Sequence, residues 1–199
     1  MEARENSVHA RIGMWLFLLS EILIFGGLFL LYAVYRAKHP GDFHAASLEL
    51  SRFDGTLNTA ILLTSSLTAV LAIFSLQELN KPKRAIAFLA ATIGLGGAFL
   101  VVKGFEWAAK FEHGLYPRAE HLLQLPPGQI LYFGLYFTMT GLHALHVIIG
   151  MGVLSVLLSF VARGKATQER SAALENGGLY WHLVDIIWIF LFPLFYLIS

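Results

Sequence analysis

One uncharged stretch limits what this chain can fold into more than any other feature. Between Ile130 and Ala162 the sequence contains no Asp, Glu, Lys or Arg. The run exceeds the roughly 20 residues that a helix needs to cross the hydrocarbon core of a bilayer. Other long apolar runs accompany it, and a composition of 57% hydrophobic and 14% charged residues argues against a soluble domain. We therefore predict an all-α, polytopic membrane helical bundle.

The apolar runs divide the chain into five membrane-spanning helices within a single transmembrane domain, residues 1–199. The first run is too long for the core of a signal peptide, so we interpret it as a retained span. The predicted spans are about residues 12–35, 57–77, 85–102, 130–162 and 179–198. The predicted connections are a loop at 36–55, a tight turn at 81–84, and loops at 111–128 and 163–176.

The distribution of Lys and Arg predicts the orientation of the bundle. With the N-terminus inside, the inner segments carry eight basic residues and the outer segments six, among them Lys103 and Lys110. Short loops rich in Lys and Arg stay on the cytoplasmic side of a membrane. The count therefore favours an N-in, C-out topology.

Two histidines, His143 and His146, interrupt the uncharged stretch. Residues three, four and seven apart share one face of a helix. That face carries Tyr136, Met139, Thr140, His143, His146 and Gly150. Polar atoms are costly against lipid, so we expect this seam to turn toward other helices.

Glu21 lies near the middle of the first predicted span. An ionised carboxylate at mid-membrane costs about 3 kcal/mol or more. Two interpretations stay open from the sequence. Glu21 is either a proton-exchanging, carbodiimide-reactive acid or a neutral acid hydrogen-bonded to a neighbouring helix or subunit.

The last span brings His182 and Asp185 within three residues of each other, so that the carboxylate could orient the imidazole. The side chains that could ligate a metal are His143, His146, His182, Asp185, Glu21 and Glu106. The chain lacks the paired Glu-x-x-His motifs of di-iron bundles and the His-Glu-x-x-His motif, and it has no cysteine. A bis-His haem site between a seam histidine and His182 is geometrically possible, but we favour a structural hydrogen-bonded core.

Two further polar positions are interpreted as structural. Glu106 has Lys103 three residues before it and Lys110 four after it, a spacing that permits intrahelical ion pairs and a stabilised helix end. Asn58 begins a group of hydroxyl-bearing residues in the second span. Side chains of this kind commonly hold membrane helices together.

Five segments resemble, in order, motifs of subunit III of the haem-copper respiratory oxidases. The resemblance runs from about Ile12 to the end of the sequence, and Glu175 falls where the family also has an acid. The segments are residues 13–21 (GMWLFLLSE), 57–63 (LNTAILL), 103–106 (KGFE), 140–150 (TGLHALHVIIG) and 180–188 (YWHLVDIIW).

The resemblance implies an accessory, non-catalytic subunit III of a proton-pumping cytochrome c oxidase. The chain itself would carry no cofactor, because haem and copper lie in partner subunits, and it would bind phospholipid. Its main partner would be subunit I, whose proton uptake and turnover stability it supports, alongside subunit II and a possible small subunit IV. Cytochrome c would be an indirect partner, and the net charge of +1 gives no sign of nucleic acid. The expected location is the bacterial cytoplasmic (inner) membrane, crossed several times.

The resemblance also implies roles for individual residues. Glu21 aligns with the family's carbodiimide-reactive acid. Candidates for helix contact or lipid contact are Trp15, Phe29, Asn58, Glu106, His143, His146, Glu175, His182 and Asp185. Longer members have seven spans, and the two helices that this chain lacks form one wall of a lipid-filled cleft. A similar cleft here would need a wall supplied by another subunit.

Alternative functions stay open at this stage. They are subunit III of a quinol oxidase, an accessory subunit of a nitric oxide reductase and, more remotely, a bis-His membrane cytochrome. A small transporter would be expected to show inverted repeats or broken helices, and neither is visible.

Overall fold

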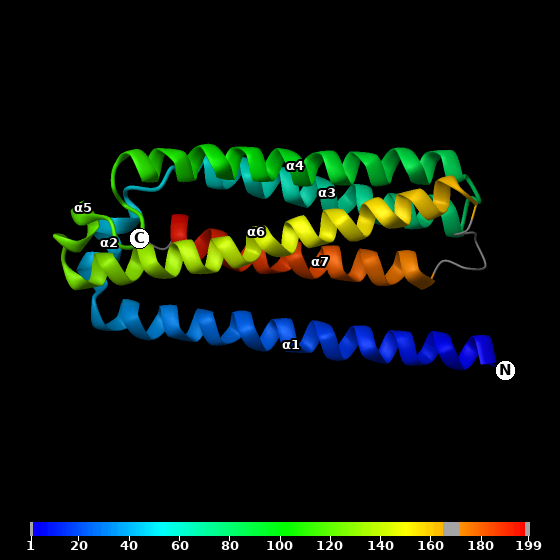
Figure 1. The fold of residues 1–199 in the computed structure, drawn as a ribbon, viewed down its shortest axis with the longest axis horizontal. Coiled ribbons are helices and arrows are strands. Elements are labelled where there is room, and N and C mark those ends of the chain that lie inside the picture. The colour runs from blue at the N-terminus through cyan, green and yellow to red at the C-terminus, as the bar shows by residue number, and fades with distance from the viewer. Residues whose placement is uncertain (1, 165–171, 198–199) are drawn as a thin grey trace.

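The computed structural model describes residues 2–164 and 172–197, and the side chains of residues 12–164 and 173–197. These residues form long, roughly parallel helices that run the length of the molecule (Figure 1). The elements are α1 (Glu2–Lys38), α2 (Pro40–Ser47), α3 (Arg52–Gln77), α4 (Pro82–Glu112), α5 (Glu120–Leu123), α6 (Pro127–Ala162), α7 (Ala172–Phe192) and the π-helical turn η2 (Pro193–Leu197). Part of the loop predicted at 163–176 and the end of the last predicted span lie outside the described residues.

Five helices in the described part of the chain are long and apolar enough to cross a membrane, which confirms the predicted all-α membrane bundle. Their candidate spans are Ile12–Lys38, Arg52–Gln77, Pro82–Glu112, Pro127–Ala162 and Ala173–Leu197. The helices extend beyond the predicted apolar cores because backbone hydrogen bonding continues until a breaker residue intervenes.

Proline and glycine mark where these helices begin and end. α4 and α6 begin at Pro82 and Pro127, where the missing proline N–H removes no intrahelical bond. Gly114 and Gly164 follow the ends of the same two helices with φ of +66°. Glycine adopts this left-handed conformation without steric cost and so terminates a helix.

The region predicted as a loop at 36–55 contains the short helix α2, which packs on the first turn of α6. The Asp42 carboxylate accepts a hydrogen bond from the backbone N–H of Gly128 at 3.1 Å. A Cβ on Gly128 would lie 2.4 Å from the Asp42 carboxylate, so this close approach requires glycine. A carboxylate at a helix N-terminus is also favoured by the helix dipole. α2 and α5 together cover one end of the bundle (Figure 1).

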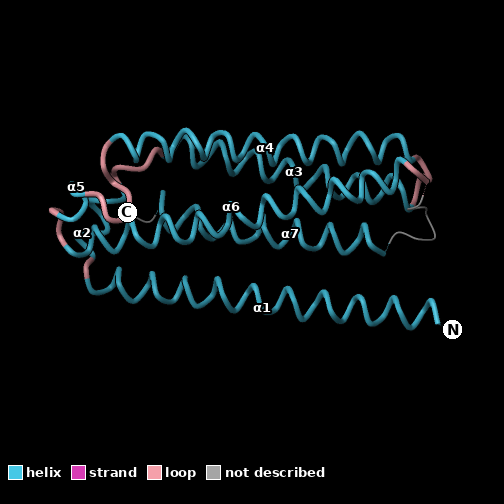
Figure 2. Tube along the Cα trace, viewed as in Figure 1, coloured by secondary structure: helices cyan, strands magenta, loops and turns pink. Residues whose placement is uncertain are grey.

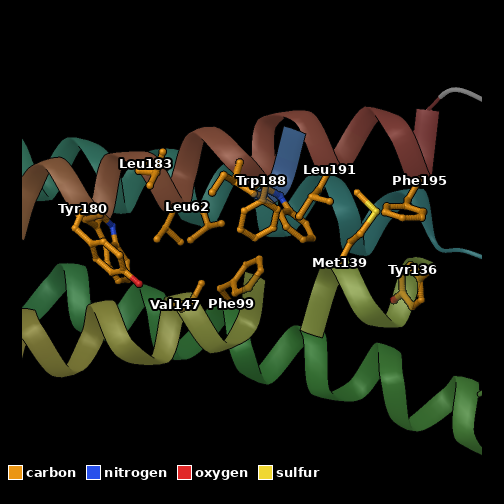
Figure 3. Packing of buried hydrophobic residues seen from close by; sticks show 14 of the residues in the cluster. Leu62, Phe99, Tyr136, Met139, Val147, Tyr180, Leu183, Trp188, Leu191 and Phe195 are labelled. Carbon is orange, nitrogen blue, oxygen red and sulfur yellow. The ribbon is translucent and has the colours of Figure 1, made fainter. Parts of the chain in front are cut away.

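Figure 2 shows that α6 and α7 run between the α3–α4 pair on one side and α1 on the other. α1 packs mainly on α6 and α7, and much of its surface is exposed. Residues from several helices meet at Trp188, whose ring centroid lies 4.8 Å from that of Phe99 (Figure 3). This aromatic core fixes the relative positions of α4, α6 and α7.

Trp181 occupies a slot between two glycines. A Cβ on Gly96 of α4 would lie 2.8 Å from the Trp181 ring, and one on Gly150 of α6 would lie 2.9 Å from it. Gly150 is part of the seam predicted on α6, and all six residues of that seam are buried. Small residues let the backbones of membrane helices approach closely, as the sequence pattern indicates.

Candidate functional site

Glu21 and His146 are joined across the interface between α1 and α6. Oε2 of Glu21 lies 2.8 Å from Nε2 of His146. Both residues are buried, with 8% and 7% of their surfaces exposed. Two of the polar residues singled out in the sequence, 125 positions apart, are therefore direct partners.

The hydrogen-bond partners of His146 show that one proton lies in its contact with Glu21. Nδ1 of His146 lies 2.7 Å from the carbonyl oxygen of Leu142, which can only accept, so Nδ1 carries a proton. The Nε2 atom then accepts from a protonated Glu21, or donates to an ionised one when the imidazole is charged. Either arrangement places a single proton between the carboxyl group and the imidazole.

Aromatic and apolar groups surround the pair. Phe25 meets the His146 ring edge-on at a centroid distance of 5.5 Å, and the Tyr180 hydroxyl donates to the His146 carbonyl oxygen at 3.2 Å. A groove of about 350 Å³ opens beside it between α1 and α7. The groove is lined by Ile22, Phe25, Gly26, Phe29, Leu183, Ile186, Ile187 and Phe190.

His182 contacts α3 rather than Asp185. Its Nδ1 atom lies 2.7 Å from the Ser66 hydroxyl oxygen. Within the described residues no donor meets a carboxylate oxygen of Asp185 at hydrogen-bonding geometry, although the Ser66 hydroxyl is nearby. Asp185 is nevertheless 3% exposed, so it faces the interior of the bundle.

Two indole groups extend the contact between α3 and α7. Trp188 donates its Nε1–H to the Thr59 hydroxyl, and Trp181 donates to the Ser65 hydroxyl, each at 3.0 Å. A buried indole N–H needs such an acceptor. Thr59, Ser65 and Ser66 of the second span thus join α3 to α7, whereas Thr68 contacts Thr92 of α4.

His143 and Asn58 are completely buried, with 0% of each residue exposed. The His143 ring packs against Phe99 and Trp188, with centroid distances of 5.5 and 5.3 Å. In the part of the chain that the structure describes, the ring nitrogens of His143 and the amide atoms of Asn58 have no hydrogen-bond partner.

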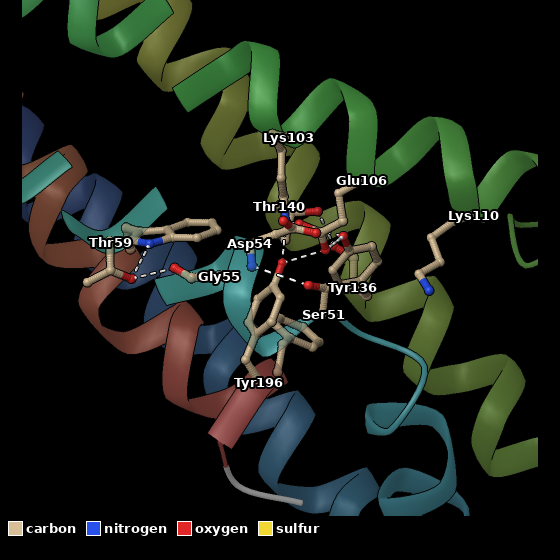
Figure 4. Close-up of polar contacts among 12 residues, drawn as sticks. Ser51, Asp54, Gly55, Thr59, Lys103, Glu106, Lys110, Tyr136, Thr140 and Tyr196 are labelled. Atoms are coloured by element: carbon tan, nitrogen blue, oxygen red, sulfur yellow. Dashed lines mark hydrogen bonds and ion pairs between the residues drawn. The ribbon is translucent and has the colours of Figure 1, made fainter. Parts of the chain in front are cut away.

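Lys103 and Glu106 form a buried ion pair in α4, with Nζ 3.1 Å from Oε2 (Figure 4). Two tyrosines complete it. The hydroxyls of Tyr136 and Tyr196 donate to Oε1 of Glu106 at 2.5 and 2.6 Å. We refer to Lys103, Glu106, Tyr136 and Tyr196 as the charged centre.

The charged centre differs from the helix end expected at Glu106. α4 continues to Glu112, and Lys103 and Glu106 are only 3% and 5% exposed. Lys110 turns away from the centre and donates to the backbone carbonyl of Glu49. The two tyrosines were not predicted as partners of Glu106, although Tyr136 lies on the α6 seam and Tyr196 shares a helix face with His182.

The remaining candidates lie at the edges of the bundle. Trp15 is 63% exposed on α1, whereas Phe29 lines the groove between α1 and α7. Glu175 accepts a hydrogen bond from the side-chain amide of Gln77 at 2.6 Å, joining α7 to the end of α3.

The bis-His haem alternative requires two histidines to turn toward one iron. In the structure His146 and His182 already bind helix neighbours, and the His143 ring is enclosed by aromatic rings. Among residues 2–164 and 172–197, no group of three His, Cys, Asp or Glu side chains gathers as a metal site. The imidazoles contact neighbouring helices in this structure.

These features define a polytopic integral membrane protein whose buried acids and imidazoles mostly join one helix to another. The chain matches the family model for cytochrome c oxidase subunit III over residues 5–199. The chain belongs to the cytochrome c oxidase subunit III family.

Curated relatives agree with this assignment. A cytochrome c oxidase subunit 3 of Bacillus subtilis is 30% identical over 191 residues, covering 94% of this chain and 86% of the relative. One of Corynebacterium diphtheriae is 31% identical over 190 residues, covering 94% and 87%. A heme-copper oxidase subunit I+III of Aeropyrum pernix is 33% identical over 195 residues, covering 94% of this chain and 22% of that longer protein.

Proposed function

We propose that this chain is the accessory, non-catalytic subunit III of a proton-pumping cytochrome c oxidase, packed against subunit I. The observation that carries the proposal is the Aeropyrum pernix relative. Its printed name joins subunit I and subunit III in one protein, and its similarity extends over 94% of this chain. Two domains in one polypeptide stay at high effective concentration, as expected for subunits that remain associated.

The internal contacts of the bundle support a non-catalytic role. Glu106, His146 and His182 each bind a side chain on another helix. Groups used in this way stabilise the packing of the helices. Haem and copper belong, in this proposal, to the partner subunits.

The pair of Glu21 and His146 is the proposed proton-linked element. A single shared proton lies at the α1–α6 interface, beside an apolar groove open at the surface of the bundle. A carbodiimide needs a carboxyl proton to become activated, and a proton on Glu21 meets that need. We propose that Glu21 is the carbodiimide-reactive acid and that its helix supports proton uptake into subunit I.

The groove between α1 and α7 is the proposed site of a phospholipid chain. Its lining is apolar throughout and includes Phe29. An acyl chain fits this surface because it brings no polar group that would need a partner. Trp15, exposed nearer the start of α1, suits the interfacial region, where tryptophan is enriched.

We propose an N-in, C-out orientation in the bacterial cytoplasmic membrane. Lys103 supports this orientation because it is neutralised by Glu106 inside α4 and does not act as an outer loop charge. The end of the bundle that carries α2 and α5 then faces outward. In this proposal the chain is associated with subunit II, a small subunit IV and cytochrome c through the assembled complex.

The functional test compares the purified oxidase with and without this chain. We expect slower proton uptake, correspondingly slower oxygen consumption and faster loss of activity during turnover when the chain is removed. Adding the chain back should restore the lifetime. The Ser155→Ala variant should restore it equally, because the Ser155 hydroxyl donates to the Met151 carbonyl of its own helix. Equal lifetimes with and without the chain would refute the supporting role.

A further inference from the structure

The turn after α7 is wound differently from the helix it continues. Residues 193–197 form the π-helical turn η2, which begins at Pro193. Proline lacks a backbone N–H and so interrupts the hydrogen-bond pattern of an α-helix. π-Helical turns are rare and occur often at functional positions. Phe195 and Tyr196 of this turn are 0% and 1% exposed, so the turn is inserted into the bundle.

Two tyrosines from other helices bind the backbone of η2. The Tyr32 hydroxyl of α1 donates to the carbonyl oxygen of Leu194 at 2.5 Å. The Tyr132 hydroxyl of α6 donates to the carbonyl oxygen of Phe195 at 2.9 Å. Carbonyl groups at a helix end have no intrahelical partner. Here the missing donors come from α1 and α6.

The side chain of Tyr196 joins η2 to α3 and α4. Its hydroxyl lies 2.5 Å from Nζ of Lys103 and donates to Oε1 of Glu106 at 2.6 Å (Figure 4). A Cβ on Gly55 of α3 would lie 2.7 Å from the Tyr196 ring, so the ring rests directly on the α3 backbone. η2 therefore contacts four long helices.

The hydrogen-bonding groups of the charged centre are all paired only when Tyr196 is present. The three N–H groups of the Lys103 ammonium face Oε2 of Glu106, the Tyr136 oxygen and the Tyr196 oxygen. Both phenolic protons go to Oε1 of Glu106. Withdrawing Tyr196 would leave an ammonium donor without its acceptor and remove one of the donors to the carboxylate. Incompletely paired buried charges are strongly destabilising.

We propose that η2 is an intramolecular docking element that binds at the charged centre. Inserted there, it fastens α1 and α6 to the α3–α4 pair. Lys103 and Glu106 act as a unit in this role, because either charge alone would face the interior without its partner. Withdrawal of η2 would remove the hydrogen bond at the Tyr32 end of α1 and leave the Glu21–His146 contact and apolar packing to hold this helix.

Hydrogen–deuterium exchange with mass spectrometry, on the purified complex containing the full chain, tests this proposal. In the Lys103→Met variant we expect the amides of residues 194–197 to lose protection by about 100-fold or more, as breaking a buried charge pair implies. Amides around Tyr32 should lose protection as well. The double variant Lys103→Met/Glu106→Gln should exchange more slowly than Lys103→Met alone.

Lys110→Met is the matched control. Lys110 is also a buried lysine of α4, but it binds the Glu49 carbonyl outside the charged centre. Equal protection of η2 in Lys103→Met and Lys110→Met would overturn the proposal, because apolar packing alone would then hold the turn. If Lys103→Met fails to accumulate, Tyr196→Phe decides. It keeps the ring and removes the hydroxyl, and unchanged protection of η2 would equally overturn the proposal.

Discussion

Oε2 of Glu21 and Nε2 of His146 lie 2.8 Å apart, and the Leu142 carbonyl fixes which imidazole nitrogen faces the acid. The contact fastens α1 to α6 at mid-span. It also shows how an acid can be kept in a membrane-spanning helix, since a single proton between the carboxyl group and the imidazole satisfies both groups. The same residue thus serves packing and, in our proposal, proton exchange.

Glu21→Gln should leave assembly of the complex largely intact and abolish carbodiimide labelling of this chain. The glutamine amide can donate to Nε2 of the neutral imidazole, as a protonated carboxyl would, but it cannot form the carbodiimide adduct. Labelling is followed by the mass of the modified peptide. Glu120→Gln, at the exposed start of α5, is the comparison and should retain labelling at residue 21. Undiminished labelling in Glu21→Gln would rule out this assignment.

His182→Ala should loosen the association of this chain with the complex without changing the haem spectrum. It removes the hydrogen bond to Ser66 between α7 and α3, a contact of about 1 kcal/mol in a membrane interior. Ser66→Ala should produce a similar loss, measured as the fraction of the chain retained after detergent washing. A haem band that disappears while the chain stays bound would contradict the structural role of His182.

Gly150→Ala should destabilise the bundle by about 1–3 kcal/mol, the usual cost of overpacking. The new methyl group would lie 2.9 Å from the Trp181 ring, which is held by Gly96 on its other side. Gly152→Ala is the control on the same helix, because no atom of another helix in the described residues lies within 4 Å of its added Cβ. Thermal unfolding in detergent should give a lower Tm for Gly150→Ala only. Equal values for the two variants would show that the slot can relax.

The absence of cysteine from this chain makes its topology directly measurable. Lys81, between α3 and α4, and Glu120, at the start of α5, are both exposed and lie at opposite ends of the bundle. With the N-terminus inside, Glu120→Cys should react with a membrane-impermeant maleimide on intact cells. Lys81→Cys should react only after the membrane is opened. The reverse pattern would show the opposite orientation.

The sequence contained enough information to predict the class of fold and the buried face of α6. Periodicity and the cost of polar atoms in lipid together place Tyr136, His143 and His146 inside the bundle, and the structure buries all three. Both signals come from the residues of a single helix, so the neighbouring helices need not be known. The five spans could be located from apolar length alone, because a helix must be long and apolar to cross the bilayer core.

Spacing within one helix also predicted the Lys103–Glu106 ion pair, but the partners that other helices supply to the buried groups could not be predicted in the same way. Spacing favoured His182 beside Asp185 and Lys110 beside Glu106, but helix packing instead brings Ser66 to His182 and the Glu49 carbonyl to Lys110. Such pairings depend on how helices far apart in sequence are set against each other. No local pattern of residues encodes that arrangement.

The central claim is that this chain supports a larger catalytic partner and carries no redox centre of its own. The most direct test is to isolate the tagged chain from membranes in mild detergent and to identify every polypeptide that accompanies it. We expect an oxidase subunit I in stoichiometric amount, with all haem absorbance in the partner chains once they are separated. Recovery of this chain alone, with a bis-His haem spectrum, would contradict the claim.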